Sequence, residues 1–533
     1  MILKSSLAFF WISTLCQFPK AFSIPTPFKY NSKIYMRGGN QDPIPNIQYP
    51  EETLSSPSHG ILFIDNFCHY HGGYLSNKAR AVYNVATIQS LSTYVSGFIS
   101  MQGSTDHLKD CIPSPDEIEA WRKQIPFEIV AIVCESDSGL EEAELLGEAL
   151  NVKFHNGYNP ARRDKFLMNQ ELEKHGMRTV GQKMCGSLEE AICFARELGV
   201  VDESEMKQEK QDVDGISENK SNEDSDVNTG KLGLANNAPT FLSKKEKYCV
   251  VKPKRGVGSD DVYFCSNLQQ VERAFQKVKG TSVFGSTSGE KHDHVLIQEF
   301  AQGTEYAIDI VSKDGEHKVA ALWRYDKRQA NGAPFVYFAT ELVDAHSTEG
   351  KIVCEYAKQT LNVLGLKHGL THSEFIVDEK GARLVEVNCR QHNTNFAPLA
   401  MAAIGYNALD LLLAAYLGDL EDLPLEMQQF QLPWDEIPDV PVTRAFAAIV
   451  HLVCYKEGEV TNVRDDLLEE IQNMDSVYAM EIYDNFAVGE RIEKTIDIKS
   501  DSGWVHLIND DEEQFKKDYD RIVELMPEMF DVK

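Results

Sequence analysis

The stretch RLVEVNCRQHN, residues 383–393, alternates apolar and polar side chains and is typical of a strand that runs into a polar segment. Because successive side chains of a strand point to opposite faces, Glu386, Asn388 and Arg390 would share one face. An acid, an amide and a guanidinium in a row are compatible with the solvated face of an antiparallel sheet. The sequence just before this stretch tests that explanation.

The preceding residues complete a predicted β-hairpin. In GLTHSEFIVDEKGARLVEVN, residues 369–388, DEKGA joins two alternating apolar runs, and Gly381 stands where a three-residue loop needs a left-handed conformation. A one-residue slip in the register would move side chains to the other face. With Asp378 opposite Ala382, the predicted register pairs Glu374 with Glu386 and His372 with Asn388.

The opposed glutamates predict a metal site. Two carboxylates directly opposite each other repel, so a sheet has no structural reason to keep Glu374 and Glu386 as neighbours. A divalent cation between them removes the repulsion, and an oxygen-only ligand set favours Mg²⁺ or Mn²⁺ over zinc. Such a metal usually holds phosphates, which directs attention to phosphate-binding loops.

A candidate phosphate loop lies in YCVVKPKRGVGSDDVYF, residues 248–264. Lys252 ends an apolar run, and the glycine-containing residues 255–259 would allow backbone N–H groups to approach an anion. A plain surface turn is the alternative. The sequence has no P-loop motif, its glycines follow the lysine rather than precede it as in protein kinases, and no G-x-G-x-x-G opens a helix.

The segment VLIQEFAQGTEYAIDIVS, residues 295–312, completes a resemblance to the ATP-grasp superfamily of ATP-dependent ligases. Three segments follow one another in the order and spacing of that superfamily. They are the two strands around the glycine loop after Lys252, the present hinge segment with Glu305, and the closing strand with the Glu-x-Asn motif. Upstream, NPARRDKFLMNQELEKHGM, residues 159–177, resembles the helix that carries its first nucleotide lysine. Asn159 and Pro160 suit the N-cap and first turn of that helix. The resemblance covers roughly residues 60–420.

The resemblance implies a role for each motif. Lys165 and Lys252 would contact the phosphates of the nucleotide, and a flexible loop with Gly256, Gly258 and Ser259 would cover them. Gln298, with the backbone of Glu299 and Ala301, would bind adenine. Glu305 would bind the ribose hydroxyls. The residues that match the magnesium ligands are Glu374, Glu386 and Asn388. The cofactors implied are therefore ATP and Mg²⁺, or Mn²⁺ in its place.

Within the superfamily, EVNCRQHNTNFAPL, residues 386–399, looks most like ligases that join two amino acids. That likeness implies that Arg390 binds a substrate carboxylate. Lys327 resembles a further phosphate-binding lysine, with a salt-paired surface lysine as the alternative. His372 could hydrogen-bond a phosphate or substrate oxygen, with a structural histidine as the alternative.

The implied activity is ligation of a carboxylate, expected to be that of an amino acid, to an amine through an acyl phosphate, with ADP and phosphate as products. A carboxylase of the same superfamily is one rival, although no M-K-M biotin-carrier segment occurs. A ligase with a thiol acceptor and a non-catalytic nucleotide sensor are the others. A sensor would be expected to lose a metal carboxylate, and none of the three ligand positions is lost.

Composition limits the partners. A formal net charge of −29 argues against nucleic acid, whose phosphates need a basic face. No apolar run of 18 residues lies beyond the N-terminus, so we expect no membrane domain. The eleven cysteines lack C-x-x-C spacing, which suggests neither a disulfide framework nor a zinc site. Small-molecule substrates are the expected partners, and a homodimer is left open.

The N-terminus predicts targeting. MILKSSLAFFWISTLCQFPKAFS, residues 1–23, has the basic start, apolar centre and small-residue site of a signal peptide. The following residues carry basic side chains and no acid before Asp42, which resembles a transit peptide behind a signal peptide. We therefore expect residues 1–45 to direct the protein to a plastid through the ER. The secretory pathway and the cytoplasm are the alternatives.

The predicted fold class is α/β and α+β, an ATP-grasp fold with a small N-terminal parallel α/β domain and a C-terminal α+β domain. Strand–helix alternation predicts the first domain, at whose sheet edge Glu135 could reach a ligand or begin a helix cap. An acidic segment without a supporting core is expected to be disordered within the ATP-grasp domain. The predicted divisions are a pre-ATP-grasp domain at 60–160, the ATP-grasp domain at 161–420 with the acidic insert at 202–246, and the C-terminal domain at 421–533.

Overall fold

The structure is a computed structural model that describes residues 34–36, 57–66, 68–92, 118–123, 125–202, 204–205, 247–256, 261–284, 290–420 and 431–533. Nearly all of the predicted targeting segment and of the acidic insert lies outside these residues. So do Gly258 and Ser259 of the predicted phosphate loop. The predictions for these segments, and the domain boundaries, stay predictions.

The N-terminal unit has a parallel three-stranded sheet, in the order β3-β2-β4, as the strand–helix alternation predicts. The central strand β2 (His59–Ile64) is buried almost throughout, because helices and the rest of the protein cover both of its faces. Its other elements are β3 (Ala86–Ser90), β4 (Glu128–Cys134), α2 (Tyr74–Tyr83), α4 (Ile118–Arg122), α5 (Leu140–Ala149) and the π-helical turn His69–Gly73.

A four-stranded antiparallel sheet, in the order β5-β8-β6-β7, carries the predicted lysine strand. Two helices pack on it through a buried apolar cluster. The capping box formed by Ser187 and Glu190 fixes the start of the first helix. The elements are β5 (Gln182–Cys185), β6 (Cys249–Lys252), β7 (Tyr263–Cys265), β8 (Val295–Glu299), α7 (Leu188–Glu197) and α9 (Leu268–Val278).

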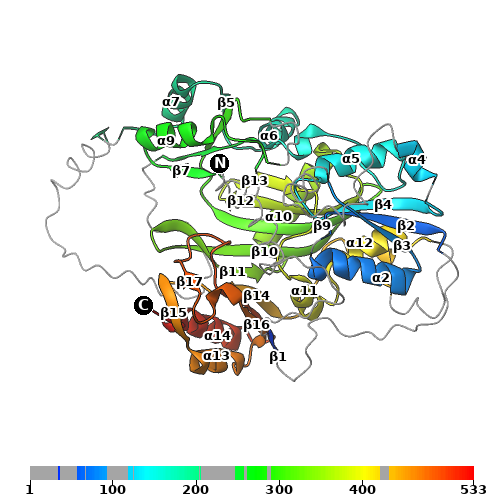
Figure 1. Ribbon diagram of the computed structural model, residues 1–533. Helices are drawn as coiled ribbons and strands as arrows, with labels where there is room; N and C mark the ends of the chain where they lie inside the picture. The colour runs from blue at the N-terminus through cyan, green and yellow to red at the C-terminus, as the bar shows by residue number, and fades with distance from the viewer. Residues whose placement is uncertain are drawn as a thin grey trace.

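A nine-stranded antiparallel sheet forms the centre of the molecule, in the order β1-β16-β18-β14-β11-β10-β9-β12-β13 (Figure 1). The predicted hairpin, β12 and β13, lies at one end of this order. The strands towards this end of the order are β9 (Thr304–Lys313), β10 (Glu316–Ala330), β11 (Ala333–Leu342), β12 (Gly369–Asp378) and β13 (Gly381–Asn388).

The two faces of β9 meet different helices because its side chains alternate. Ile308 and Ile310 face α6 (Lys165–Lys174) and α10 (Thr348–Val363), whereas Ala307 and Val311 belong to the cluster around α11 (Ala397–Ala403) and α12 (Ala408–Leu417). The helix that carries Lys165 begins later than the sequence suggests. Asn159 caps a separate 3₁₀ turn, Pro160–Arg162, and Asp164 caps α6 by accepting from the amides of Phe166 and Leu167.

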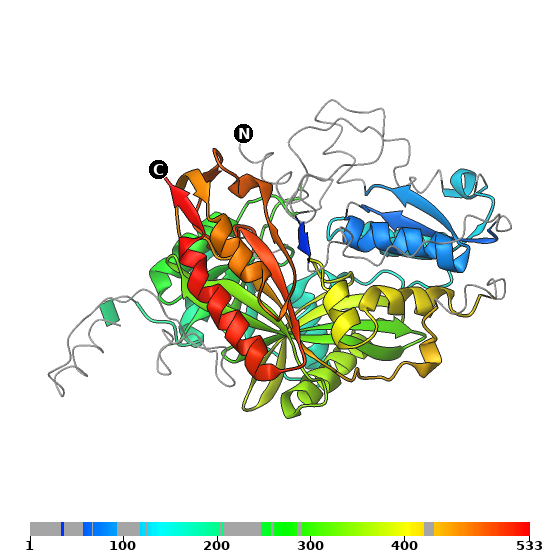
Figure 2. The same ribbon diagram turned by 90° about the horizontal axis from the view of Figure 1, so that it is seen from below.

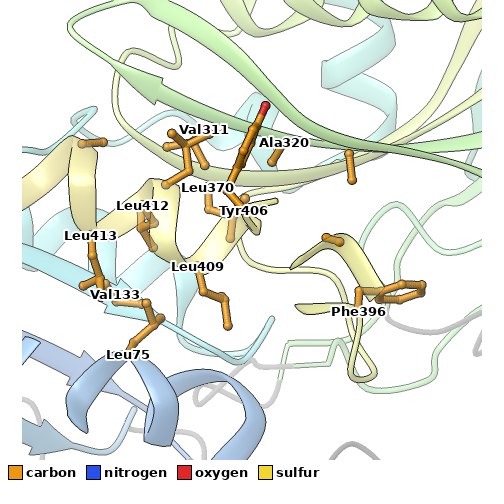
Figure 3. Close-up of a cluster of buried hydrophobic side chains, with 14 of the residues drawn as sticks. Leu75, Val133, Val311, Ala320, Leu370, Phe396, Tyr406, Leu409, Leu412 and Leu413 are labelled. Atoms are coloured by element: carbon orange, nitrogen blue, oxygen red, sulfur yellow. The ribbon is translucent and has the colours of Figure 1, made fainter. Parts of the chain in front are cut away.

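Helix α12 joins the N-terminal unit to the central sheet. In Figure 3, Leu409, Leu412 and Leu413 of α12 lie between Leu75 and Val133 of the N-terminal unit and the sheet residues, which include Val311. These side chains belong to one buried cluster, so the two units share an apolar core. Burial on all sides explains why α12 is apolar around its circumference except at Asp410, which is ion-paired with Lys78 of α2 at 2.7 Å.

The C-terminal segment has the predicted α+β content, but three of its strands continue the central sheet rather than forming a sheet of their own (Figure 2). A separate apolar core lies beneath helix α14. Its elements are β14 (Phe446–His451), β15 (Gly458–Val463), β16 (Val477–Ile482), β17 (Arg491–Ile492), β18 (Gly503–Asn509), β19 (Phe530–Val532), α13 (Asp465–Gln472), α14 (Glu512–Leu525) and the 3₁₀ turns Trp434–Glu436, Asp484–Phe486 and Met526–Glu528.

Two further features concern segments with sequence-based predictions. Strand β1 (Ile34–Met36), which lies inside the predicted targeting segment, pairs with β16 at the far edge of the central sheet. Within the described part of the chain no single helix has the length and apolar character to cross a membrane. Helices α11 and α12 meet that test only as a pair, bent by 89° at the break between them.

Candidate active site

The carboxylate pair of the β12–β13 hairpin forms as predicted, although the turn does not. Glu374 lies opposite Glu386, and His372 lies opposite Asn388. The turn is one residue tighter than expected, because Asp378 pairs with Gly381 rather than Ala382. A β-bulge between Glu374 and Phe375 takes up the difference and restores the register of the polar residues.

The neighbours of Glu386 hold it ionised. Its Oε2 lies 2.7 Å from Nζ of Lys165, and its Oε1 accepts a hydrogen bond of 3.0 Å from the Asn388 amide. Burial alone would raise the pKa of Glu386, but Lys165 and Asn388 hold it well below its usual range. Two carboxylates and an amide oxygen on one face match the oxygen ligands of Mg²⁺, so the residues present fit this ion.

A second lysine stands beside this group. Lys252, at the end of β6, is buried, and no ion pair joins it to a described residue. Burial and the charge of Lys165 lower the pKa of Lys252 to about 8. Lys165 also donates to the carbonyl of Gly256 at 3.2 Å, so the helix α6 and the glycine loop meet at this lysine. The buried ammonium group of Lys252 and the partly exposed one of Lys165, next to paired carboxylates, form a charge pattern suited to a polyphosphate–metal ligand.

Glu305 and Lys327 form an ion pair on the same face of the sheet, with 2.7 Å between Oε2 and Nζ. The ammonium group of Lys327 lies 4.8 Å from the ring centre of Tyr325 and 4.4 Å from that of Tyr337. Burial would lower the pKa of Lys327, but Glu305 raises it. Lys327 is therefore salt-paired, but on the site face of the sheet rather than at the outer surface, and its predicted role at a phosphate stays a prediction.

A model of the ATP-grasp domain family matches residues 246–396, which span the lysine strand, the hinge and the carboxylate hairpin. This chain contains an ATP-grasp domain. The chain is also similar to dapdiamide A synthase from Enterobacter agglomerans, with 24% identity over 397 residues that cover 74% of this chain and 78% of that protein.

Solved structures agree on the fold of the ATP-grasp domain and its surroundings. The L-amino acid ligase from Bacillus licheniformis matches with a TM-score of 0.58 and 15% identity, over 90% of this chain and 100% of that chain. Carboxyaminoimidazole ribonucleotide synthase from Aspergillus clavatus, solved with ATP, matches with a TM-score of 0.53 and 12% identity, over 88% of this chain and 99% of that one. The mixed α/β architecture is thus that of ATP-grasp proteins.

The adenine residues implied by the resemblance lie at the end of β8. The Gln298 side chain donates to Gln182 at 2.9 Å, and Glu299 is ion-paired with Arg383 at 3.1 Å. Ala301, just beyond the strand, is buried. Three phenylalanine rings pack against one another beside this segment, namely Phe264, Phe300 and Phe335. They offer an aromatic surface that the sequence did not predict.

His372 has carboxylates on both sides. Its Nε2 lies 3.4 Å from Oε1 of Glu374, and its Nδ1 lies 3.5 Å from Oδ1 of Asp309. Burial would lower the pKa of His372, but these two carboxylates raise it to about 9. Each ring nitrogen thus faces a carboxylate, and the predicted contact with a phosphate or substrate oxygen stays a prediction.

Arg390 reaches out of the ATP-grasp domain to the N-terminal unit. Its Nη2 donates to Oδ2 of Asp137 at 2.8 Å, and its Nη1 donates to the Gln391 carbonyl and to Asn393 Oδ1. Arg163 donates to the other oxygen of Asp137 at 3.0 Å. Within the described residues, three of the five N–H donors of Arg390 are thus used, and two remain for a ligand.

Sequence reasoning missed several residues of this region. Glu135, which the sequence placed at a ligand or a helix cap, accepts hydrogen bonds from the amides of Cys68 and Gly72 at the π-helical turn before α2, and its contact with a ligand stays a prediction. The group that faces the ATP-grasp domain is Asp137, two residues further on. Its position after a buried parallel strand was the available signal. Asp309 is a single acid within an apolar strand, and His392 lies within residues 383–393. Both residues could therefore also have been identified from the sequence.

Proposed function

We propose that this protein is an ATP-dependent carbon–nitrogen ligase that activates the carboxylate of an amino acid and joins it to an amine. The observation that carries the proposal is the hairpin face with Glu374, Glu386 and Asn388, set against two lysines, the buried Lys252 and the partly exposed Lys165. Similarity to dapdiamide A synthase and to an L-amino acid ligase supports this reaction class. ADP and phosphate are the expected products.

The residues act by position and charge. Lys165 and Lys252 would neutralise the phosphates of ATP, and Glu374, Glu386 and Asn388 would hold Mg²⁺, which supplies charge neutralisation at the transferring phosphoryl group when bound. Arg390, fixed by Asp137, would orient the substrate carboxylate for attack on that group. The acyl phosphate formed in this step then reacts with the amine.

Stimulation of ADP release by amino acids tests the proposal. The full-length protein is incubated with ATP and Mg²⁺, with and without mixed amino acids, and products are identified by mass. A ligase releases ADP in proportion to a new condensed product. A nucleotide sensor shows no stimulation, and a carboxylase responds to bicarbonate instead of an amine.

The pKa of Lys252 predicts how ATP affinity depends on pH. This lysine is charged below about pH 8 and loses its proton as the pH rises through that value. The dissociation constant for ATP should therefore increase about tenfold between pH 7 and pH 9, as expected for a single proton linked to binding. Isothermal titration at constant Mg²⁺ measures it.

The Lys252→Arg variant is the matched control, because a guanidinium stays charged over this range. Its ATP affinity should change little between pH 7 and pH 9. An equally steep loss in this variant would show that a different group titrates.

Arg390→Lys is expected to raise KM for the amino acid, or lower kcat, by the equivalent of about 1.5–3 kcal/mol for a charged hydrogen bond. A lysine cannot reproduce the forked donors of the guanidinium. Steady-state kinetics with a saturating nucleotide measure the change, and ATP affinity should be nearly unaltered.

The control is Arg163→Lys, which alters the other guanidinium bound to Asp137. Its effect on the amino-acid KM should be smaller. If Arg390→Lys instead weakens ATP binding and leaves amino-acid kinetics intact, Arg390 belongs to the phosphate site.

A further inference from the structure

Arg383 of β13 joins two sheets and the chain that runs between them. Its Nη1 donates to Oε1 of Glu299 at 3.1 Å, and its Nη2 donates to the Gln302 carbonyl at 3.3 Å and to Oδ2 of Asp378 at 3.1 Å. Glu299 ends β8 of the four-stranded sheet, and Asp378 ends β12 of the central sheet. The buried guanidinium therefore holds both sheets and the β8–β9 connection, residues 300–303, in one arrangement.

The contacts of Arg383 belong to a closed ring of polar groups. Arg178 donates to both carboxylate oxygens of Asp378, at 2.6 Å each, and Oε2 of Glu299 accepts from the amide of Gly181 at 3.2 Å. Arg178 and Gly181 both lie between α6 and β5. The ring thus runs from this segment through Asp378, Arg383 and Glu299 and back to it, and it ties the β8–β9 connection to helix α6 and to the β12–β13 hairpin.

The β8–β9 connection is also held on its other side. Gly303 has a φ of +150°, and a Cβ added to it would collide with the carbonyl oxygen of Val377 on β12. Only glycine fits such a close approach of two backbones. The connection is therefore fixed against β12 at Gly303 and against β13 at Arg383, which sets the positions of its backbone N–H and C=O groups.

We propose that Arg383 is a positioning residue that sets the selectivity of the nucleotide site for adenine. The inference rests on the proposed function, in which the base of ATP would bind the backbone at Glu299 and Ala301. Adenine and guanine carry an amino and a keto group at the same ring position, so they exchange donor for acceptor. Backbone groups reject the wrong base only when they cannot move to meet it. Arg383 acts on the base through the connection that it holds.

The competing account is a crosslink that only stabilises the fold. Glu299 has 43% of its side chain exposed, so water screens its ion pair with Arg383 and little stability depends on it. A purely stabilising role would lower the melting temperature of a variant without changing which nucleotide it prefers. Nucleotide preference therefore separates the two accounts, and its measurement does not depend on ligase turnover.

Binding of ATP, GTP and inorganic triphosphate to the full-length protein tests the inference. Isothermal titration at constant Mg²⁺ gives the three dissociation constants for wild type and for Arg383→Met. The expected result is an ATP constant raised about tenfold, as for loss of a charged hydrogen bond, and a preference for ATP over GTP reduced by the same factor. The triphosphate constant should stay unchanged, because this ligand has no base.

Three results would overturn the inference: a wild type without preference for ATP over GTP, an unchanged preference in Arg383→Met, or an equal weakening of triphosphate binding. Wild type that binds no ATP would overturn the proposed function and this inference with it. Wild type that binds and prefers ATP, with Arg383→Met behaving alike, overturns the inference alone.

Further variants test whether the arginine acts through Glu299. Glu299→Ala should reduce the preference for ATP, and the double variant should be no worse than Arg383→Met, because both changes remove one shared contact. Arg178→Lys is the matched control: its donors go to Asp378 and the Gly381 carbonyl, and a lysine keeps the charge opposite Asp378, so its preference should equal that of wild type. Additive losses in the double variant, or an equal loss in Arg178→Lys, overturn the proposal. Should Arg383→Met fail to fold, Glu299→Ala, at a partly exposed position, still decides it.

Discussion

Replacing Glu386 with glutamine is expected to lower the rate of amino-acid-dependent ADP release by at least roughly a thousandfold, or about 4 kcal/mol of activation free energy. Glutamine keeps the shape of the side chain but removes the charge that balances Lys165 at 2.7 Å and that would hold Mg²⁺. Charge placed where the phosphoryl group is transferred contributes most when water is excluded, which explains the size of the loss.

The fold of this variant should be retained, because glutamine can still accept the hydrogen bond from Asn388. Glu379→Gln is the matched control, since this exposed glutamate lies in the turn of the same hairpin. It should leave turnover unchanged. If Glu386→Gln melts much earlier yet keeps its activity per folded molecule, Glu386 is structural and the proposed metal site is wrong.

Asp137→Asn is expected to cost about 3–5 kcal/mol of stability, the usual range for removing one partner of a buried ion pair. Asp137 is the carboxylate between Arg390 and Arg163, and Arg390 has only 6% of its side chain exposed. Without it, two guanidinium groups are left near each other without a counter-charge. Denaturant unfolding and hydrogen exchange of the N-terminal unit measure the effect.

The same variant should also raise the amino-acid KM, because Arg390 loses the group that orients it. Asp202→Asn is the control: its ion pair with Arg196 is also between aspartate and arginine, but that arginine is 60% exposed. Such a surface pair contributes about 0–1 kcal/mol. A comparably small loss for Asp137→Asn would mean that water reaches Asp137 and that the contact between the two units is weak.

The sequence by itself determined the features that depend on neighbours along the chain. The alternation in residues 369–388 placed Glu374, Glu386 and Asn388 on one face, because side-chain direction in a strand follows local periodicity. The turn was predicted with the wrong length, yet the carboxylates still faced each other since a bulge compensated for it. The parallel N-terminal sheet also followed from local patterns.

The tertiary structure alone decided which distant residues meet. Asp137 lies 253 positions before Arg390, and Asp309 meets His372 and His392 only because β9 is the neighbour of β12. Alternation also could not show that the C-terminal strands extend the central sheet. The physical reason is that periodicity reports which face of an element is buried, whereas strand order and the burial of helix α12 determine what that face is buried against.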